Sequence, residues 1–350
     1  YIYMSALNKT ILTLQSHVVY GYVGNRAIQA IINYLRYNLD IINLIQFSNH
    51  TGYENHTGEI IDPKELENIL ESNKSCNFNY DGFLLGYLSN NNNLKLIKKY
   101  LGDVYNEKDF KQILLLDPVM GDDNEIYVEK NIIEEYRNII KSPNLTNNLI
   151  LTPNLFELQI LTGNESKLTS ELTLKDMLAM ADDVFKYKEY NNLKMLVITS
   201  LNDLHFRENS NDNNNNNNNT EYIYTLCITP YKNYLFKVEK YDTYFTGVGD
   251  MFSGILLYSL LELDTMQHLD NDSLVIKCID FTLNFIHQFL KITLENRDLS
   301  LLDKLSLNDV HRDPILMKDY ELKILKAIRV LKPKGIKQID LDKSYFEAII

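Results

Sequence analysis

A glycine-rich turn followed by an aspartate is the feature of this sequence with the most specific chemical meaning. In the stretch TGVGDMFSG, Gly247 and Gly249 flank Val248, and Asp250 follows directly before an apolar run. Glycines allow a tight turn, and a turn that leads into a helix directs several N–H groups and the positive end of the helix dipole at one point. The motif predicts an anion-binding cradle with a catalytic carboxylate, or else a turn in which Asp250 is simply the helix N-cap.

Two further motifs carry oxygen atoms of the kind that bind a divalent cation. DPVMGD supplies Asp117 and Asp122, and the proline and glycine between them force a turn. TPNLFE places Asn154 and Glu157 three positions apart, on one face of a helix that starts after Pro153. Such oxygens suit Mg²⁺, often through water and a substrate phosphate. The same TPNLFE pattern also predicts an N-cap with its capping box, and the two interpretations are compatible.

Several common catalytic patterns are absent from the sequence. No third glycine stands where a dinucleotide fingerprint requires it after Gly249, and there is no G-x-x-x-x-G-K-[ST] phosphate loop. His17 has no partner at metal-ligand spacing and no G-x-S-x-G elbow to serve. We therefore interpret His17 as a hydrogen-bonding or structural residue, and the same interpretation applies to His50 in SNHTGY.

The elements that must position these motifs are indicated by short apolar runs that precede them. The runs are typical of buried strands in a parallel sheet, and they cover Thr10–Leu14, Ile41–Phe47, Tyr80–Leu85, Gln112–Leu116, Asn148–Leu151 and Lys194–Ile198. Segments with helical spacing alternate with them at Arg26–Tyr37, Pro63–Leu70, Leu94–Leu101, Lys130–Ile140, Asn154–Leu161 and Leu172–Tyr187. This alternation predicts an α/β fold with helices on both faces of a mostly parallel sheet. Because ligands bind beyond the carboxyl ends of such strands, the motifs are predicted to line one cleft.

The pattern changes after Ser200. An antiparallel strand pair is predicted at Glu221–Ile228 and Tyr234–Val238, and long helices are predicted at Met251–Leu263 and Ser273–Leu294. Tyr320–Leu331 fits a strand and a helix equally well.

Two asparagine-rich tracts interrupt this order, one at Arg207–Thr220 and a shorter one at Asn90–Asn93. Polar tracts of this kind cannot bury apolar surface, so both are predicted to be disordered loops. We find no internal repeat and no clear linker, which predicts a single domain over residues 1–350.

The composition limits the classes of function. The chain has 350 residues and a formal net charge of -12, so a nucleic-acid role, which needs clustered Lys and Arg, is not expected. Cys76, Cys227 and Cys278 lack disulfide or metal spacing and indicate reduced thiols. No apolar run reaches the roughly 18 residues of a membrane helix, and the N-terminal residues lack a signal-peptide pattern. We expect a cytoplasmic or nuclear protein, with Met4 as a candidate start residue.

In their order along the chain, the motifs resemble the signature series of the pyridoxal kinase family in the ribokinase superfamily. The series is QSHVVYGYVGNRA, QFSNHTGY, LLGY, LDPVMGD, ILTPNLFE, VITS and FTGVGDMFSG, from about Thr10 to Leu290. The first two are the most specific, because sugar kinases and hydroxymethylpyrimidine kinases start differently. The resemblance implies a ribokinase-like fold and ATP-dependent phosphorylation of the 5′-hydroxymethyl group of pyridoxal, pyridoxine and pyridoxamine. It also implies a homodimer that uses Mg²⁺, or another divalent ion such as Zn²⁺, and K⁺.

Carried over residue by residue, the resemblance assigns a role to each motif. Asp250 matches the catalytic base, which also contacts the substrate, and Gly247, Val248 and Gly249 match the anion hole. Residues that match the vitamin site are Ser16, Thr51 and Tyr87 around the ring, with Val23 and Phe47 as apolar walls. Residues that match the ATP phosphate region are Asp117, Asp122, Thr152, Asn154, Glu157, Thr199, Ser200, Gly247 and Gly249, of which Asp117, Asn154 and Glu157 match the metal site.

The sequence also departs from the family pattern. Val248 stands where many relatives have a small polar residue, and the segment Asp122–Val128 is short. The tail segment YELKIL resembles the family's C-terminal strand more weakly. Two alternatives stay open: a kinase for hydroxymethylpyrimidine or another small molecule, and a catalytically silent relative that binds B6 vitamers.

Overall fold

The computed structural model describes residues 9–106, 112–122, 124–142, 145, 148–186, 193–206, 221–297, 313–331 and 344–350. The asparagine-rich insert at 207–220, predicted to be disordered, lies outside these residues.

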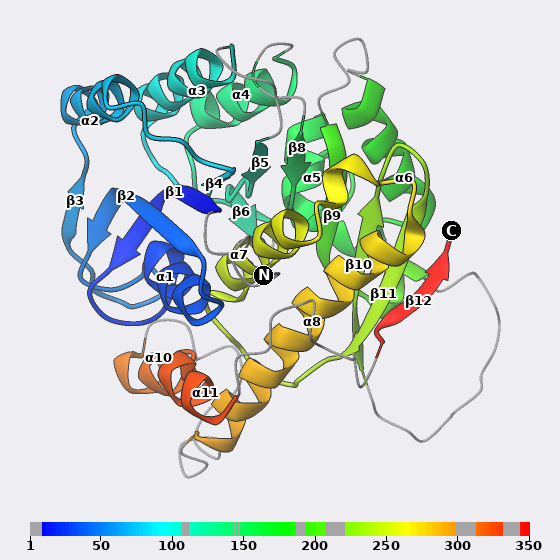
Figure 1. Cartoon of the computed structure of the whole chain (residues 1–350). Helices are drawn as coiled ribbons and strands as arrows, with labels where there is room; N and C mark the ends of the chain where they lie inside the picture. The colour runs from blue at the N-terminus through cyan, green and yellow to red at the C-terminus, as the bar shows by residue number, and fades with distance from the viewer. Residues whose placement is uncertain are drawn as a thin grey trace, which may run out of the picture.

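One large sheet runs through the described part of the chain, with ten strands in the order β12-β11-β10-β9-β8-β5-β4-β1-β2-β3 (Figure 1). The six central strands, from β2 to β9 in this order, are parallel to one another. One edge is completed by antiparallel β3, and the other by antiparallel β10, β11 and β12. The strands are β1 (Thr10–Val18), β2 (Asn38–Phe47), β3 (Gly58–Ile60), β4 (Gly82–Leu85), β5 (Ile113–Leu116), β8 (Leu149–Leu151), β9 (Leu193–Asn202), β10 (Tyr222–Ile228), β11 (Asn233–Glu239) and β12 (Phe346–Ile349). The predicted fold class is thereby confirmed, including its antiparallel portion in the C-terminal half.

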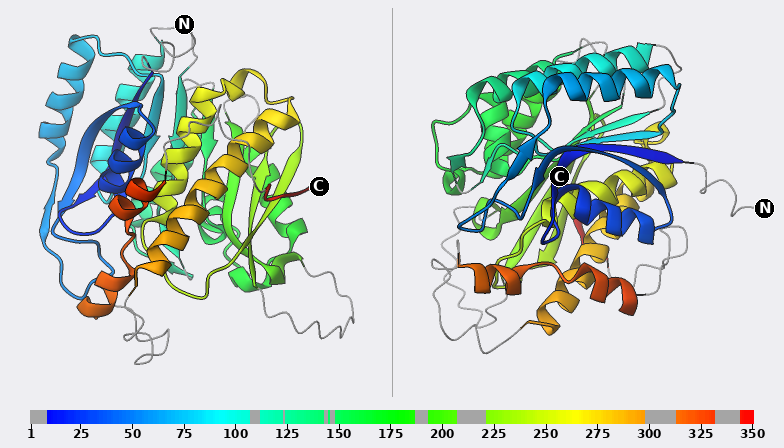
Figure 2. Two further views of the ribbon diagram at one scale, coloured as in Figure 1. Left: turned by 60° about the horizontal axis from the view of Figure 1, so that its bottom comes forward. Right: turned by 90° about the vertical axis from the view of Figure 1, so that its left-hand side faces the viewer.

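Helices cover both faces of this sheet (Figure 2). One face carries α2 (Pro63–Ser75), α3 (Asn91–Asn106), α4 (Lys130–Ile140), α5 (Leu155–Thr162) and α6 (Leu174–Phe185). The other carries α1 (Gly24–Tyr34), α7 (Val248–Glu262), α8 (Asp272–Glu295) and α11 (Ile324–Val330). Each face has its own hydrophobic cluster against the sheet, which makes a three-layer arrangement. The short helix α10 (Pro314–Tyr320) packs apart from both layers, against Tyr53 and Tyr244.

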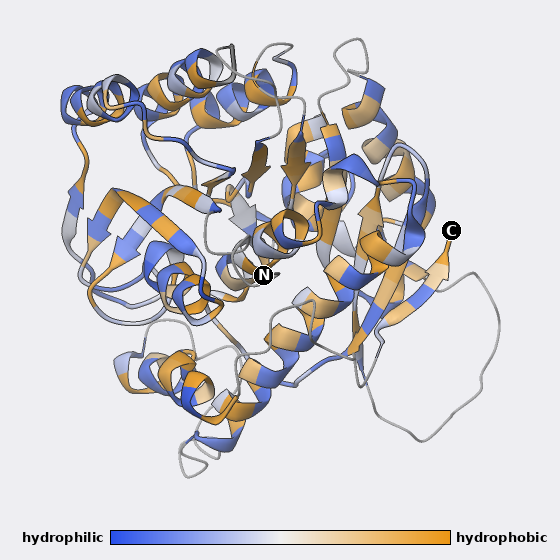
Figure 3. Cartoon of the chain, in the orientation of Figure 1, coloured by the Kyte–Doolittle hydropathy of each residue, from blue (hydrophilic) through white to orange (hydrophobic). Residues whose placement is uncertain are grey.

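The hydrophobic pattern explains why these elements form. All four residues of β5 are buried, because the strand is covered by helices on both faces, and it is hydrophobic along its whole length (Figure 3). The surface helices α2 and α3 instead show both hydrophobic and hydrophilic residues. In α1, Ala27, Ile28, Ile31 and Ile32 recur at helical spacing and are all buried.

Helix α7, which follows the glycine turn, is enclosed by its neighbours. Every residue from Met251 to Glu262 is buried, and the helix packs against α1, α8 and strands β4 and β5. Helix α7 is therefore fixed within the core, which gives its start a rigid support.

The structure decides between the two alternatives left open for Tyr320–Leu331 in favour of a helix. The weaker resemblance of YELKIL to a C-terminal strand does not hold, because α10 ends at Tyr320, Glu321 turns the chain, and α11 begins at Ile324. Buried contacts of Glu321, Leu322 and Ile324 hold this segment against the rest of the protein, and the edge strand is β12 instead.

The tract Asn90–Asn93 is ordered, contrary to the prediction. The Asn90 side chain accepts hydrogen bonds from the backbone N–H groups of Asn92 (2.9 Å) and Asn93 (3.3 Å), as an N-cap does. Asn93 is buried and donates to the carbonyl of Ile61 at 3.0 Å. Asparagines that fail to form a core can thus still start a helix.

Two predictions about the chain as a whole can be checked on the described residues. None of their helices combines the length and the apolar character needed to cross a membrane. All three cysteines are free thiols, with Cys227 and Cys278 buried and Cys76 exposed.

Candidate active site

The glycine turn before α7 lies against the chain that follows β1. Gly247 is the N-cap of α7 and has a left-handed backbone with φ of 85°. A Cβ atom at this position would overlap the carbonyl oxygen of Tyr22, so both the conformation and the space require glycine. Gly249 is exposed, and the Val248 side chain packs against the hydrophobic cluster on the α7 face of the sheet. This packing accounts for a valine in place of a small polar residue.

Asp250 lies in the first turn of α7, after the cap rather than at it. The interpretation of Asp250 as the N-cap is therefore wrong, because Gly247 occupies that position. Burial raises the pKa of Asp250 to about 6, although the backbone N–H of Gly24 and the nearby His50 both act to lower it. Gly24, with φ of 54°, packs so closely against Ser16 that a Cβ atom there would overlap the Ser16 carbonyl. The end of β1 is thereby brought next to the partner of Asp250.

A chain of buried polar groups joins α7 to the ends of β5 and β8. The Ser253 hydroxyl donates to Oδ2 of Asp117 at 2.8 Å and lies 3.2 Å from the Thr152 hydroxyl. All three residues are buried. Burial raises the pKa of Asp117 to about 7; the hydrogen bond from Ser253 opposes this rise, and the charge of Asp250 adds to it.

Glu157 and Asn154 form the predicted capping box at the start of α5. The Asn154 side chain accepts from the Glu157 N–H at 2.8 Å, and the Glu157 carboxylate accepts from the Asn154 N–H at 2.8 Å. The other Glu157 oxygen accepts from the N–H of Met120 at 3.0 Å, and Asn154 donates to the carbonyl of Gly121 at 2.9 Å. These bonds lock the DPVMGD turn to the TPNLFE turn. Burial and the charge of Asp117 raise the pKa of Glu157 well above its usual value.

Thr199 and Ser200 lie within β9 rather than after it, in contrast to the predicted end of that strand. The pairing with β10 shifts here, because Ile198 faces Leu226 whereas Leu201 faces Tyr224, so two residues of β9 oppose Thr225. Ser200 has φ of 60°, a left-handed backbone conformation that occurs in some β-bulges. Thr199 also donates its N–H to the Pro153 carbonyl at 3.1 Å, which joins this bulge to the TPNLFE turn.

The remaining predicted site residues differ in exposure and in the elements that carry them. Val23 is the N-cap of α1 and would contact a side chain at position 247. Tyr87 and Phe47 are partly buried, and Tyr87 packs edge-on against Tyr127 with 6.3 Å between ring centroids. Thr51 and Asp122 are exposed, in the loop after β2 and in the short strand β6 (Gly121–Asp122), which pairs with β7 (Glu125–Ile126). No hydrogen bond or ion pair in the described residues joins Thr51, Phe47 or Ser200 directly to Asp250.

The structure places two polar residues in this region that the sequence patterns did not point to. Ser253 is inside the quoted motif, but its only signal is a polar residue three positions after Asp250 in an apolar run. Glu321 is distant in sequence and yet its carboxylate lies 3.2 Å from Nε2 of His50.

The carboxylates of this region fit a divalent cation that takes only some of its ligands from the protein and the others from a substrate. Within the part of the chain that the structure describes, no three His, Cys, Asp or Glu side chains cluster as a complete metal site. Asp117 and Glu157 are nevertheless buried carboxyls, and the charge of Asp117 raises the pKa of Glu157, a situation that a cation relieves. Mg²⁺ commonly uses one or two carboxylates together with water and substrate phosphates.

Comparisons with known proteins identify relatives of this chain by sequence. The sequence matches no family model. It is 32% identical to a putative pyridoxal kinase of Saccharomyces cerevisiae, over 94% of this chain and 97% of that one. It is 30% identical to the pyridoxal kinase of Ovis aries, over 81% of this chain and 85% of that one.

Solved structures support the fold. A pyridoxal kinase of Leishmania donovani, in complex with ADP and pyridoxamine, superposes with a TM-score of 0.66 at 23% identity over 92% of this chain and 95% of that one. A putative phosphomethylpyrimidine kinase of Bacteroides thetaiotaomicron superposes with a TM-score of 0.71 at 16% identity, over 99% of this chain and 100% of that one. The shared fold does not separate these two families, whereas the sequence relatives do. The chain belongs to the pyridoxal kinase family.

Proposed function

We propose that this chain transfers the γ-phosphoryl group of ATP to the 5′-hydroxymethyl group of pyridoxal, pyridoxine and pyridoxamine. The observation that carries this proposal is the setting of Asp250, a carboxyl in the first turn of α7 with a pKa of about 6, directly after the Gly247 turn. Membership of the pyridoxal kinase family supports the choice of substrate.

Asp250 acts as the general base in this proposal. A carboxyl with a pKa of about 6 is mostly ionised at pH 7 and is still a stronger base than an ordinary aspartate. It accepts the proton of the substrate hydroxyl while the oxygen attacks the γ-phosphorus and ADP leaves. The Gly24 N–H, which interacts with the Asp250 carboxylate, holds it in place for this step.

The backbone N–H groups of Gly247, Val248 and Gly249 stabilise the charge on the transferring group. This role depends on the backbone alone, so a valine side chain that packs into the core is compatible with it. Phosphoryl transfer depends mainly on positioning and electrostatics, and the protein need not form a covalent intermediate.

Asp117 and Glu157 would hold Mg²⁺, with Asn154 and Asp122 nearby. A bound Mg²⁺ neutralises charge on the ATP phosphate oxygens. Thr152, Thr199 and Ser200 would contact those phosphates or a K⁺ ion. Ser16, Thr51 and Tyr87, with Val23 and Phe47, would surround the vitamin ring.

A coupled assay with ATP, Mg²⁺, K⁺ and each B6 vitamer tests the function, with hydroxymethylpyrimidine as a competing substrate. We expect phosphorylation of the vitamers. Phosphorylation of hydroxymethylpyrimidine but not of pyridoxal would contradict the proposal. Asp250→Ala and Asp250→Asn should each lower turnover by at least about 10²-fold while ATP still binds, and full activity in either variant would remove Asp250 from the mechanism.

We further propose a homodimer in the cytoplasm. The exposed apolar side chains of Val19 (63% exposed), Tyr20 (46%) and Ile60 (44%) support a dimer, because the chain after β1 and the edge strand β3 both pair with the end of β2. Light scattering at micromolar concentration tests the dimer, and a monomer mass would contradict it.

A further inference from the structure

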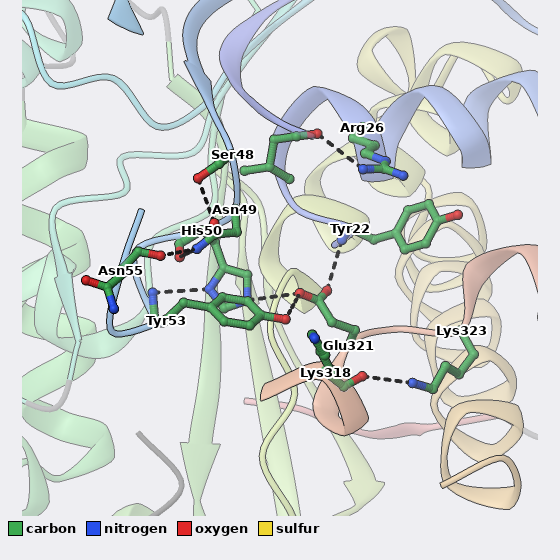
Figure 4. A network of polar contacts seen from close by, with 12 residues as sticks. Tyr22, Arg26, Ser48, Asn49, His50, Tyr53, Asn55, Lys318, Glu321 and Lys323 are labelled. Carbon is green, nitrogen blue, oxygen red and sulfur yellow. Dashed lines mark hydrogen bonds and ion pairs between the residues drawn. The ribbon is translucent and has the colours of Figure 1, made fainter. Parts of the chain in front are cut away.

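A buried carboxylate from the C-terminal part of the chain lies between two loops on the vitamin side of the proposed site (Figure 4). Glu321 follows α10 and is only 5% exposed. One oxygen accepts from the backbone N–H of Tyr22 at 3.0 Å. The other accepts from the Tyr53 hydroxyl at 3.0 Å and lies 3.2 Å from Nε2 of His50. Three groups from two loops thus converge on one carboxylate.

These two loops follow the neighbouring strands β1 and β2. The first passes Glu321 at Gly21, where φ is 89° and a Cβ atom would overlap the carboxylate. The close approach therefore requires glycine at this position. Tyr22 and Gly21 together place the carboxylate directly against the backbone of this loop.

The second loop is held through His50. The backbone N–H of Gly52 donates to Nδ1 of His50 at 3.2 Å, which turns the Nε2 side of the ring toward Glu321. The His50 and Tyr53 rings pack together with 4.7 Å between their centroids. Thr51, the proposed substrate contact, lies between these two anchored residues.

The first loop leads directly to Asp250. Two residues after Tyr22, the Gly24 N–H interacts with the Asp250 carboxylate. Gly247 packs against the carbonyl of the same Tyr22. The position of the backbone at Tyr22, which Glu321 fixes, therefore sets the surroundings of both the base and the glycine turn.

Glu321 is itself held from a third direction. Arg297, next to the end of α8, lies over the rings of Tyr320 (4.3 Å from the centroid) and Phe245 (4.8 Å) and donates to the Tyr244 carbonyl at 2.8 Å. Phe245 belongs to the segment that leads into the glycine turn. The carboxylate is thus presented from a fixed support rather than from a free tail.

We propose that Glu321 is a positioning residue that holds the two vitamin-side loops in their binding geometry. This inference rests on the proposed function, because it assigns those loops to the vitamin rather than to ATP. Loss of the carboxylate releases the loop containing Thr51 and the Gly24 N–H together. It leaves the capping box of Glu157 and the Asp117–Ser253 pair, on the ATP side, in place.

Glu321→Gln tests this directly, because it keeps the size of the side chain and removes one acceptor. We expect the KM for pyridoxal to rise about tenfold or more, since small displacements of positioning groups have large effects, while the KM for ATP changes less than about twofold. Tyr53→Phe, which removes one of the two hydrogen-bond donors, should give a smaller rise. The two changes combined should raise KM by less than the product of their separate effects.

Glu262→Gln is the matched control. Glu262 is also a buried carboxylate that accepts from a tyrosine hydroxyl, that of Tyr37 at 2.7 Å, but it lies at the far end of α7. This variant should leave both KM values unchanged. Equal effects of the Glu321 and Glu262 variants, or parallel rises of the two KM values, would overturn the proposal.

Hydrogen–deuterium exchange gives a test that does not depend on the substrate. In Glu321→Gln, exchange should increase in peptides covering residues 20–25 and 48–55, and not in the C-terminal half of α7. If wild-type protein fails to phosphorylate pyridoxal, the proposed function fails, and this measurement still decides whether Glu321 holds the loops. Unchanged exchange in both peptides would refute the positioning role.

Discussion

The hydroxyl of Ser253 donates to the carboxylate of Asp117 over 2.8 Å, from one turn after Asp250 in α7 to the end of β5. The helix that carries the proposed base and the strand end that carries the proposed metal carboxylate are thereby coupled by one bond. Because the bond favours the ionised form of Asp117, it opposes the rise in pKa that burial causes. The proposed magnesium ligand is thus kept closer to its charged form.

Ser253→Ala should weaken the use of Mg²⁺. A hydrogen bond to a buried charged group is worth about 1.5–3 kcal/mol, so its loss should raise the Mg²⁺ concentration for half-maximal rate by about tenfold. Initial rates at pH 7 as a function of Mg²⁺ measure this. Ser259→Ala is the control, because Ser259 is buried in the same helix but donates only to the Ile255 carbonyl of its own helix. Similar Mg²⁺ dependence in both variants would contradict the prediction.

Asp117→Asn should change how stability depends on pH. In the folded protein the pKa of Asp117 is about 7, against the usual 3.8, so between these values the folded state keeps a proton that the unfolded state has lost. The contribution of this group to stability is therefore present below about pH 4 and is lost as pH rises toward 7. The difference corresponds to at most about 4 kcal/mol.

Urea unfolding of the metal-free protein at pH 5 and pH 8 measures this effect. Wild-type protein should lose more unfolding free energy between the two values than Asp117→Asn does. The substitution should also strongly reduce kinase activity, although it leaves an oxygen that accepts from Ser253. Parallel pH dependence in both proteins would show that Asp117 ionises freely.

The dependence of activity on pH should report Asp250. Its protonated form cannot accept the substrate proton, so kcat/KM should be constant at neutral and higher pH and fall about tenfold per pH unit below about 6. The same acid limb of the pH profile should occur with pyridoxal and with pyridoxine, because it belongs to the enzyme. The two vitamers ionise differently, so a limb that moves with the vitamer would belong to the substrate instead.

The extent to which sequence predicted this site follows from the range of each interaction. The capping box of Asn154 and Glu157 depends on residues three positions apart, and the pattern was sufficient to predict it. The central strands were predictable as well, because burial on both faces leaves a continuous apolar run such as Ile113–Leu116. Local patterns and apolar runs were therefore sufficient to predict the parallel strands and the motifs that follow them.

The interactions that sequence could not predict join distant segments. Ser253 and Asp117 are 136 positions apart, and Glu321 is 299 positions from Tyr22. Neither pair has a periodic or spacing signal. The same long-range contacts explain why YELKIL forms no strand, since Glu321 is used to bind the N-terminal loops. The close contact between Gly247 and Tyr22 at the N-cap of α7, before Asp250, likewise joins segments far apart in the sequence.

Gly247→Ala should damage both stability and catalysis. The residue needs φ of 85°, and a Cβ atom would overlap the Tyr22 carbonyl, so the turn must move. Backbone strain of this kind costs about 1–3 kcal/mol, and displacement of the N–H groups in the proposed anion hole should lower kcat by about 10²-fold or more. Thermal unfolding and steady-state kinetics measure the two effects.

Two other glycines provide the controls for this substitution. A Cβ atom at Gly249 or at Gly102 would meet no other group within 4 Å, and both residues lie in helices. Alanine at either position should raise stability by up to about 1 kcal/mol, because glycine is the weaker helix former. Gly102 is in α3, outside the proposed site, so Gly102→Ala should also keep full activity. Wild-type stability and turnover in Gly247→Ala would show that the left-handed turn at α7 tolerates a side chain and does not need its close contact with Tyr22.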